Sequence, residues 1–108
     1  MKVVKNATGT PYEAPKHFGV YGIQKFVKES NRVKVFYSYF RPDGGAEMSG
    51  SPTEKIYYLV SGSITVSGES EKYVMNPGDI IFIDAGEERE ISINDGKPAE
   101  LLVFIITP

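Results

Sequence analysis

The chain has 108 residues, a formal net charge of −2 and no cysteine. This length corresponds to a single domain, and a hydrophobic fraction of 41% is typical of a chain that buries its own core rather than of a disordered one. The charge excludes a general attraction to nucleic acid or to a membrane surface, and the lack of cysteine excludes disulfides, thiolate metal sites and cysteine nucleophiles. No apolar stretch approaches the ~20 residues of a membrane span, so we expect a soluble, cytoplasmic protein.

The N-terminal third contains the one segment whose secondary structure the pattern leaves open. Residues 21–31, YGIQKFVKESN, place Ile23, Phe26 and Val27 at helical spacing over little more than one turn, but they fit a strand equally well. Residues 16–26, KHFGVYGIQKF, alternate basic and aromatic side chains. We interpret them as a strand that packs its aromatic rings on the rest of the domain, rather than as an RNA-binding strand, because the helices that such a fold needs are absent.

From residue 32 onward every segment is typical of β-structure. The strand 32–40, RVKVFYSYF, is predicted to end in a turn at Pro42–Gly45, and Pro77-Gly78 fits the centre of a type II turn. The other predicted strands are 55–60, 63–68, 71–75, 79–84, 89–94 and 100–107. Short strands at regular spacing, separated by Gly and Pro, predict an all-β sandwich or barrel.

Several of these strands are apolar on both faces, among them KIYYLV, DIIFI and LLVFII. One face has to line the interior, and the other needs a second cover. We therefore expect one domain, 1–108, in which residues 1–31 cover the barrel 32–108 or are exchanged with a partner subunit. A homodimer is the predicted assembly.

Residues 42–66, PDGGAEMSGSPTEKIYYLVSGSITV, and 73–104, YVMNPGDIIFIDAGEEREISINDGKPAELLVF, resemble the two motifs of the small single-domain cupins. The apolar strand ending in Gly62, the NPGD turn and the KPAELLVF ending carry the resemblance. Membership of that family implies a jelly-roll barrel, the double-stranded β-helix, with a pocket open at one end.

The same resemblance implies which positions would hold a metal in a cupin. Lys55 stands at the glutamate position, Ser49 and Ser51 at the first two histidine positions, and Arg89 at the remaining histidine position. A first-row metal needs imidazole, carboxylate or thiolate donors, and two hydroxyls with two cations are no such set. We therefore predict no metal and no cofactor.

The four substitutions suit an anion instead. If these positions project into the pocket, as the resemblance implies, Lys55 and Arg89 bring two positive charges together, Ser49 and Ser51 add hydroxyls, and the period-2 alternation puts Tyr57 on the same face as Lys55. The planar fork of Arg89 matches a carboxylate or phosphate. Two simpler roles stay open: a rim ion pair of Arg89 with Glu87-Glu88, and a Lys55 that extends out of the barrel mouth.

The predicted function is therefore the binding of a small anionic metabolite. One alternative is a metal-independent isomerase or lyase, with Lys55 as base and Arg89 as anchor for the substrate. Another is a ligand-sensing or structural dimer subunit. The single histidine, His17, lies outside both motifs, and the sequence assigns it no role.

Overall fold

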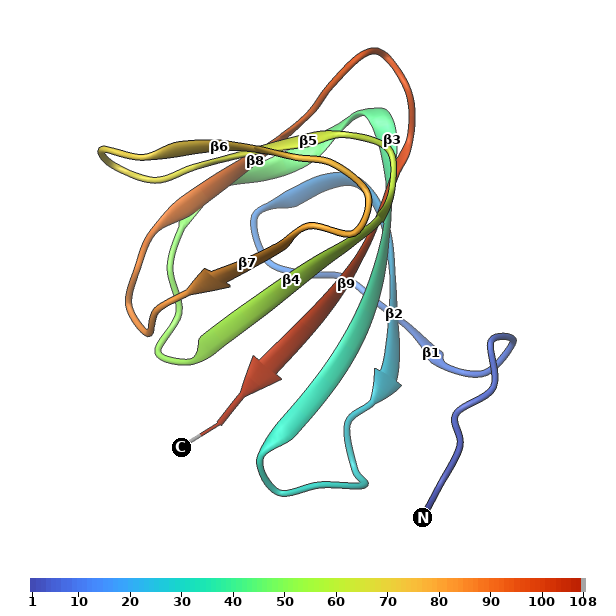
Figure 1. Cartoon of the computed structure of the whole chain (residues 1–108). Helices are drawn as coiled ribbons and strands as arrows, with labels where there is room; N and C mark the ends of the chain where they lie inside the picture. Colours follow the sequence, from blue (N-terminus) through green and yellow to red (C-terminus); the bar gives the residue numbers. More distant parts are fainter. Residues whose placement is uncertain (108) are drawn as a thin grey trace.

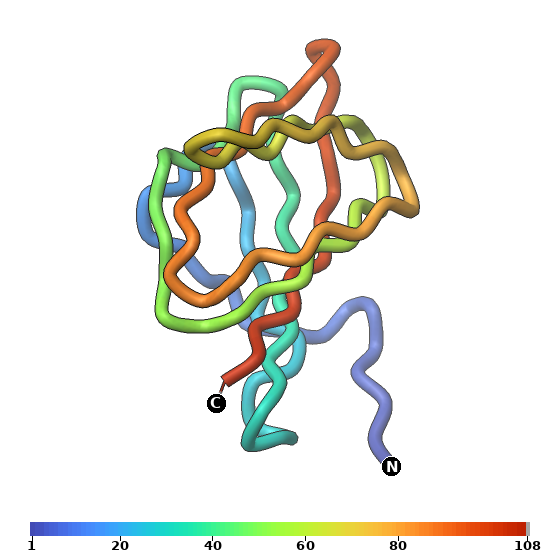
Figure 2. The backbone as a smooth tube through the Cα atoms, turned by 60° about the vertical axis from the view of Figure 1, so that its left-hand side comes forward, coloured from blue at the N-terminus to red at the C-terminus, as the bar shows by residue number. Residues whose placement is uncertain are grey.

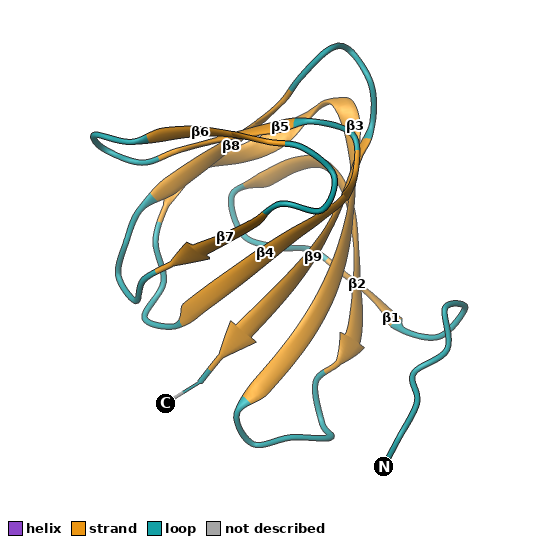
Figure 3. Ribbon diagram, in the orientation of Figure 1, coloured by secondary structure: helices purple, strands orange, loops and turns teal. Residues whose placement is uncertain are grey.

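The structure, a computed structural model, describes residues 1–107 and consists there of nine β-strands and no helix (Figure 3). In chain order the strands are β1 (Thr10–Tyr12), β2 (His17–Phe26), β3 (Val33–Ser49), β4 (Glu54–Ser61), β5 (Ile64–Ser67), β6 (Lys72–Met75), β7 (Ile80–Ile83), β8 (Arg89–Ile93) and β9 (Ala99–Ile106). The all-β prediction is confirmed, and the open choice for residues 21–31 is decided for a strand that ends at Phe26. No helix that could cross a membrane occurs in this part of the chain.

The strands form a jelly-roll barrel. Hydrogen bonds connect them in the order β6-β5-β8-β3-β9-β4-β7, with β2 beside β3 and β1 beside β2. Neighbours along this path are antiparallel, and the path curls until the backbone closes into a ring of strands (Figures 1 and 2). Its two ends, β6 and β7, are not hydrogen-bonded to each other.

The long strand β3 belongs to both halves of the barrel, one formed with β9, β4 and β7 and the other with β8, β5 and β6. The predicted turn at Pro42–Gly45 is therefore wrong, because β3 continues through these residues. Its first part, Val33 to Phe40, pairs with β9, and its last part, Gly45 to Ser49, pairs with β8. The glycines do not reverse the chain direction here; they allow the backbones of β2 and β3 to approach each other closely. A Cβ atom on Gly44 would lie 2.3 Å from the carbonyl oxygen of Gly19. As a result the chain crosses from one half to the other while remaining extended.

The turn before β7 matches the prediction. The amide of Asp79 donates to the carbonyl of Asn76 at 2.9 Å, and Gly78 has a φ of +93°. Only glycine adopts this conformation without strain, as position i+2 of a type II turn requires. The turn carries the chain from β6 to β7 across the open side of the barrel.

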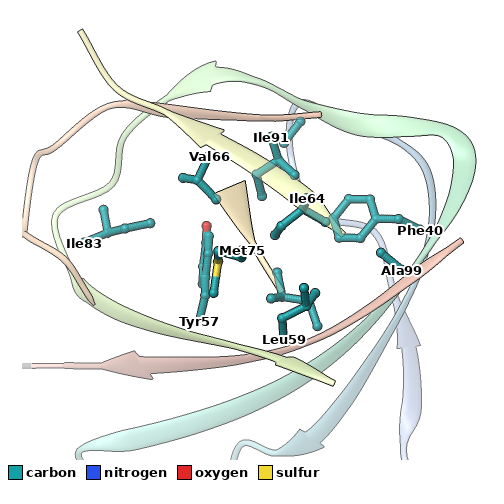
Figure 4. Packing of buried hydrophobic residues seen from close by; sticks show 11 residues of the cluster. Phe40, Tyr57, Leu59, Ile64, Val66, Met75, Ile83, Ile91 and Ala99 are labelled. Carbon is teal, nitrogen blue, oxygen red and sulfur yellow. The ribbon is translucent and has the colours of Figure 1, made fainter. Parts of the chain in front are cut away.

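The hydrophobic core fills the space between the two halves. Figure 4 shows Tyr57 and Leu59 of β4 projecting into the interior towards Ile64 and Val66 of β5. The largest side chains that are less than 2% exposed are Tyr57, Phe40, Leu59, Ile64 and Leu101. The outer face of β3, β9, β4 and β7 is different, because Tyr39, Tyr58, Val60, Ile80 and Phe82 lie exposed on these strands.

Candidate functional site

A small cavity of about 60 Å³ lies inside the barrel and brings polar side chains from five strands together. Its polar lining consists of Tyr12, His17, Ser38, Lys55, Tyr57 and Arg89. The rest of its wall is apolar. Among the described residues no carboxylate lines this cavity, so its charge is positive.

Arg89 is the most deeply buried charge of the site, with an exposed fraction of 7%. It begins β8 directly opposite Ser49 of β3. Its Nε donates to the Tyr57 hydroxyl at 2.7 Å, and its Nη1 donates to Ser49 Oγ at 3.2 Å. Two backbone carbonyls, those of Glu47 and Ser49, lie at 3.5 Å from Nη1.

All these acceptors of Arg89 are neutral. The two ion pairs within residues 1–107 join Lys2 to Glu29 and Arg41 to Asp43, so the rim ion pair considered for Arg89 does not form. Buried charges are costly unless a counter-ion accompanies them. The guanidinium therefore has hydrogen bonds but no negative partner in this part of the chain.

Lys55 lies half-buried in the same cavity, so it does not simply extend into solvent from the barrel mouth. Its Nζ donates to Ser51 Oγ at 2.5 Å, and that hydroxyl lies 3.1 Å from Thr53 Oγ1. Burial, and secondly the charge of Arg89, lower the pKa of Lys55. Its amine is therefore more easily deprotonated than that of an ordinary surface lysine.

His17 is the site residue that the sequence did not reveal. Pairing of β2 with β3 brings it to the cavity, where its ring centroid lies 6.2 Å from that of Phe40. Its Nδ1 lies 2.8 Å from the Pro15 carbonyl. A carbonyl only accepts hydrogen bonds, so Nδ1 carries a proton and the neutral ring has its lone pair on Nε2.

Burial lowers the pKa of His17, and the positive charges of Arg89 and Lys55 lower it further, whereas the bond to Pro15 opposes these effects. No spacing rule points to this residue, because it precedes both motifs. Only the chain path that lays β2 against β3 makes it part of the site.

Tyr57 contacts one of the two predicted cations, Arg89, and lines the same cavity as the other, Lys55. Burial raises the pKa of Tyr57, although the neighbouring Arg89 opposes this shift, so the phenol stays protonated at neutral pH. Its oxygen accepts from Arg89, and within residues 1–107 its own proton has no acceptor. The predicted site residues Arg89, Lys55 and Tyr57 thus meet at one cavity, while Ser49 and Ser51 hold the two cations by hydrogen bonds.

A second hollow, a groove of about 440 Å³, lies between β6 and β7 on the open side of the barrel. Tyr73 and Phe82 line it together with the carboxylates Glu71, Asp79, Glu87 and Glu88. Asp79 and Glu87 each accept a hydrogen bond from a backbone amide, at 2.8 Å and 3.0 Å. Among the described residues, Arg89 is the only one that lines both the groove and the interior cavity.

The interior residues do not fit the metal that the resemblance to cupins raised. An ammonium and a guanidinium repel a divalent cation, and one imidazole with hydroxyls is a poor donor set. Within residues 1–107 no three His, Cys, Asp or Glu side chains lie close enough together to hold a metal ion.

A jelly-roll barrel with a polar pocket in its interior is the architecture of the cupins. The family model described as "Cupin domain" matches residues 36–105, and the chain belongs to this family. A Mycobacterium tuberculosis protein named as a β-D-galactosidase is 28% identical over 111 residues, which is 100% of this chain and 96% of that protein.

Solved structures agree on the fold. The polyketide cyclase RemF of Streptomyces resistomycificus is 19% identical with a TM-score of 0.84 over 98% of this chain and 79% of its own. A predicted oxalate decarboxylase of Thermotoga maritima is 20% identical and has a TM-score of 0.82, and the match covers 99% of this chain and 100% of that one. An RmlC-like cupin of Shewanella frigidimarina is 11% identical and has a TM-score of 0.79, and the match covers 96% of this chain and 88% of that one. At these identities the similarity establishes the fold alone.

Proposed function

We propose that this cupin binds a small anionic metabolite, a carboxylate or a phosphate, inside the barrel without a metal. The observation that carries the proposal is the guanidinium of Arg89, which is 7% exposed and has only neutral acceptors among the described residues. An anion would supply the missing counter-charge. Lys55 and the free hydroxyl proton of Tyr57 would add further donors, since both residues line the same cavity.

The size of the cavity limits what the interior can hold. A water needs a cavity of about 10–15 Å³ by this kind of measure, so a cavity of about 60 Å³ accommodates only a few heavy atoms. This favours acetate-sized acids, or the charged end of a longer ligand. The apolar wall suits a short hydrocarbon part next to the charge.

Isothermal titration calorimetry with acetate, pyruvate and inorganic phosphate tests the proposal. The pH dependence of the measured affinity provides a second test, because the titratable groups of the pocket predict its direction. The titratable groups that face the pocket beside the guanidinium of Arg89 are Tyr12, His17, Lys55 and Tyr57. The pKa values of Lys55 and His17 are lowered, and an anion favours their protonated forms. Binding should therefore tighten as the pH falls from about 9 to about 6.

Protein dialysed against a chelator should bind the anions with unchanged affinity. Binding that needs an added metal, or that is independent of pH, would contradict the proposal. The stability of the apo protein should depend on pH in the opposite sense. Lys55 binds more protons in the unfolded state than in the folded state at pH values between its lowered pKa and the ordinary lysine value, so stability should rise with pH across that window.

Glycoside hydrolysis is a second candidate, because the relative named as a galactosidase covers the whole chain. Most glycosidases use two carboxyl groups, and the interior lining contains none within residues 1–107. The groove beside β6 and β7 does contain them. Two of its carboxylates, Glu71 and Glu88, have no hydrogen-bond partner among the described residues.

Release of nitrophenol from p-nitrophenyl β-D-galactoside tests this candidate. If the groove is the site, Glu71→Gln and Glu88→Gln should each lower kcat at least about 100-fold, while the interior variant Lys55→Met should not. Activity that survives both groove substitutions would contradict a site in the groove.

We also propose that the outer face of β3, β9, β4 and β7 binds a second copy of the chain. Its exposed members include Val60, Ile80 and Phe82, at 42%, 67% and 52%. Glu100, on the same face, already accepts hydrogen bonds from Tyr37 and Ser61. These bonds satisfy the hydrogen-bonding capacity of the Glu100 carboxylate within the chain, so the apolar side chains around it can pack against those of a second copy.

Light scattering coupled to size exclusion should therefore give the mass of a dimer. Phe82→Glu should shift the protein towards monomer, whereas Tyr73→Glu, at an exposed position on β6, should not. A wild-type monomer at high protein concentration would rule the dimer out.

A further inference from the structure

We infer that Lys55 is a nucleophile that forms a Schiff base with a small 2-oxo acid held by Arg89. This inference rests on the anion site proposed above and names its ligand class. It concerns a covalent step that anion binding alone does not require. An amine, a carboxylate-binding group and a base lie around one small cavity, and their placement suits this step.

The first element is the spacing of the amine and the guanidinium. Lys55 Nζ donates to Ser51 Oγ, and Arg89 Nη1 donates to Ser49 Oγ. Only Gly50 separates the two serines, so their Cα atoms lie within roughly 7 Å of each other. In a 2-oxo acid the carbonyl carbon is bonded directly to the carboxylate carbon. Because Lys55 and Arg89 line the same small cavity, a carboxylate gripped by Arg89 would place its carbonyl carbon in the cavity that Lys55 also lines.

The second element is the state of the amine. Within residues 1–107 Lys55 has no carboxylate partner, and its single hydrogen bond goes to a hydroxyl. Burial and Arg89 both favour loss of its proton. A lysine that is desolvated next to another cation is the kind of amine that attacks carbonyl groups.

The third element is His17, which lines the same cavity and can transfer protons. The Pro15 carbonyl holds the proton on Nδ1, so the basic nitrogen of the neutral ring is Nε2. The lowered pKa of this residue keeps the ring neutral and able to accept a proton.

The reaction balances without any oxidant or reductant. The neutral amine attacks the carbonyl carbon, a C–N bond forms, and the π electrons move to oxygen. His17 takes one proton from nitrogen and gives it to that oxygen, which yields a carbinolamine. The nitrogen lone pair then forms the C=N bond as the C–O bond breaks, and His17 carries the remaining N–H proton to the departing hydroxide, which gives the neutral imine and water. One amine and one 2-oxo acid yield one imine and one water.

The test is reductive trapping. The full chain is incubated with pyruvate and sodium cyanoborohydride, whose hydride reduces the C=N bond, and the product is analysed by intact mass and peptide mapping. We expect one carboxyethyl adduct per chain, at Lys55, at pyruvate concentrations that leave exposed lysines unmodified. Lys55→Arg should lose the adduct, and Lys72→Met, on the exposed strand β6, should keep it.

Lactate separates this inference from the proposed function, because it carries the carboxylate without the carbonyl. If lactate and pyruvate bind with equal affinity and no adduct forms at Lys55, the Schiff base is wrong and the anion site stands. If neither acid binds, both proposals fail. Adducts spread evenly over the exposed lysines would also overturn the inference. Lactate binding by Lys55→Arg shows that this variant is folded.

His17→Asn tests the proton transfer separately. It should slow adduct formation at least about 10-fold at neutral pH, and the effect should shrink as free imidazole is added. An unchanged rate of adduct formation would show that His17 does not transfer the proton. The trapping experiment would still decide whether Lys55 forms the Schiff base.

Discussion

Arg89→Met should lose affinity for small carboxylates by more than about 30-fold, while its free energy of unfolding stays equal to or above that of the wild type. The loss of affinity follows because removing a buried charged partner costs about 2–5 kcal/mol of binding. The stability follows from the lack of a counter-ion: an unbranched apolar side chain replaces a guanidinium that has only neutral acceptors among the described residues.

Calorimetric titration and urea unfolding measure the two effects on the same samples. Arg41→Met is the control, since Arg41 is exposed and pairs with Asp43 at 3.3 Å on the surface; its unfolding free energy should change by less than about 1 kcal/mol. Destabilisation of Arg89→Met by several kcal/mol would mean that its bonds to Tyr57 and Ser49 hold the barrel together. That result would count against a site prepared for an anion.

Gly44→Ala should destabilise the fold by about 3 kcal/mol or more. Its new methyl group would lie 2.3 Å from the Gly19 carbonyl oxygen and 2.9 Å from the Gly19 carbonyl carbon. These are backbone atoms, which cannot move aside as a flexible side chain can. The strands β2 and β3 would have to separate where β3 crosses between the halves of the barrel.

The urea midpoint measures this change, and Gly68→Ala is its matched control. A Cβ atom on Gly68 meets nothing closer than 3.5 Å, an ordinary contact, so we expect a change of less than about 0.5 kcal/mol. Gly44→Ala should also weaken anion binding, because Ser49 follows on the same strand. An unchanged midpoint would show that the crossing is looser than the structure describes.

The sequence was sufficient for the strands because their patterns are local. Alternating and continuous apolar runs such as 55–60 and 100–107 became β4 and β9, and the Pro77-Gly78 turn formed as expected. At Pro42–Gly45 the same reasoning was wrong. Glycines occur both where a chain reverses and where two backbones approach closely. At Gly44 the position of β2 shows that close approach is the reason for the glycine, and the sequence does not reveal that position.

The site was predictable to the extent that the two motifs fix positions in the barrel. Counting along them pointed Lys55 and Arg89 towards the pocket, and the alternation along the strand added Tyr57; in the structure all three line one cavity. His17 could not be found this way. It reaches the cavity through the N-terminal strand β2, outside the residues 36–105 that the family model matches.

Arg89 forms part of the wall between the interior cavity and the acidic groove, and this has a thermodynamic consequence. A charge that settles on one side changes the electrostatic potential at the guanidinium, and with it the affinity on the other side. A basic ligand in the groove would neutralise carboxylates near Arg89 and strengthen the attraction for an anion inside. Because coupling free energies are reciprocal, an anion bound in the interior cavity would raise the affinity of the groove for that basic ligand by the same factor. If both hollows bind ligands of these charges, their affinities should therefore be coupled through Arg89.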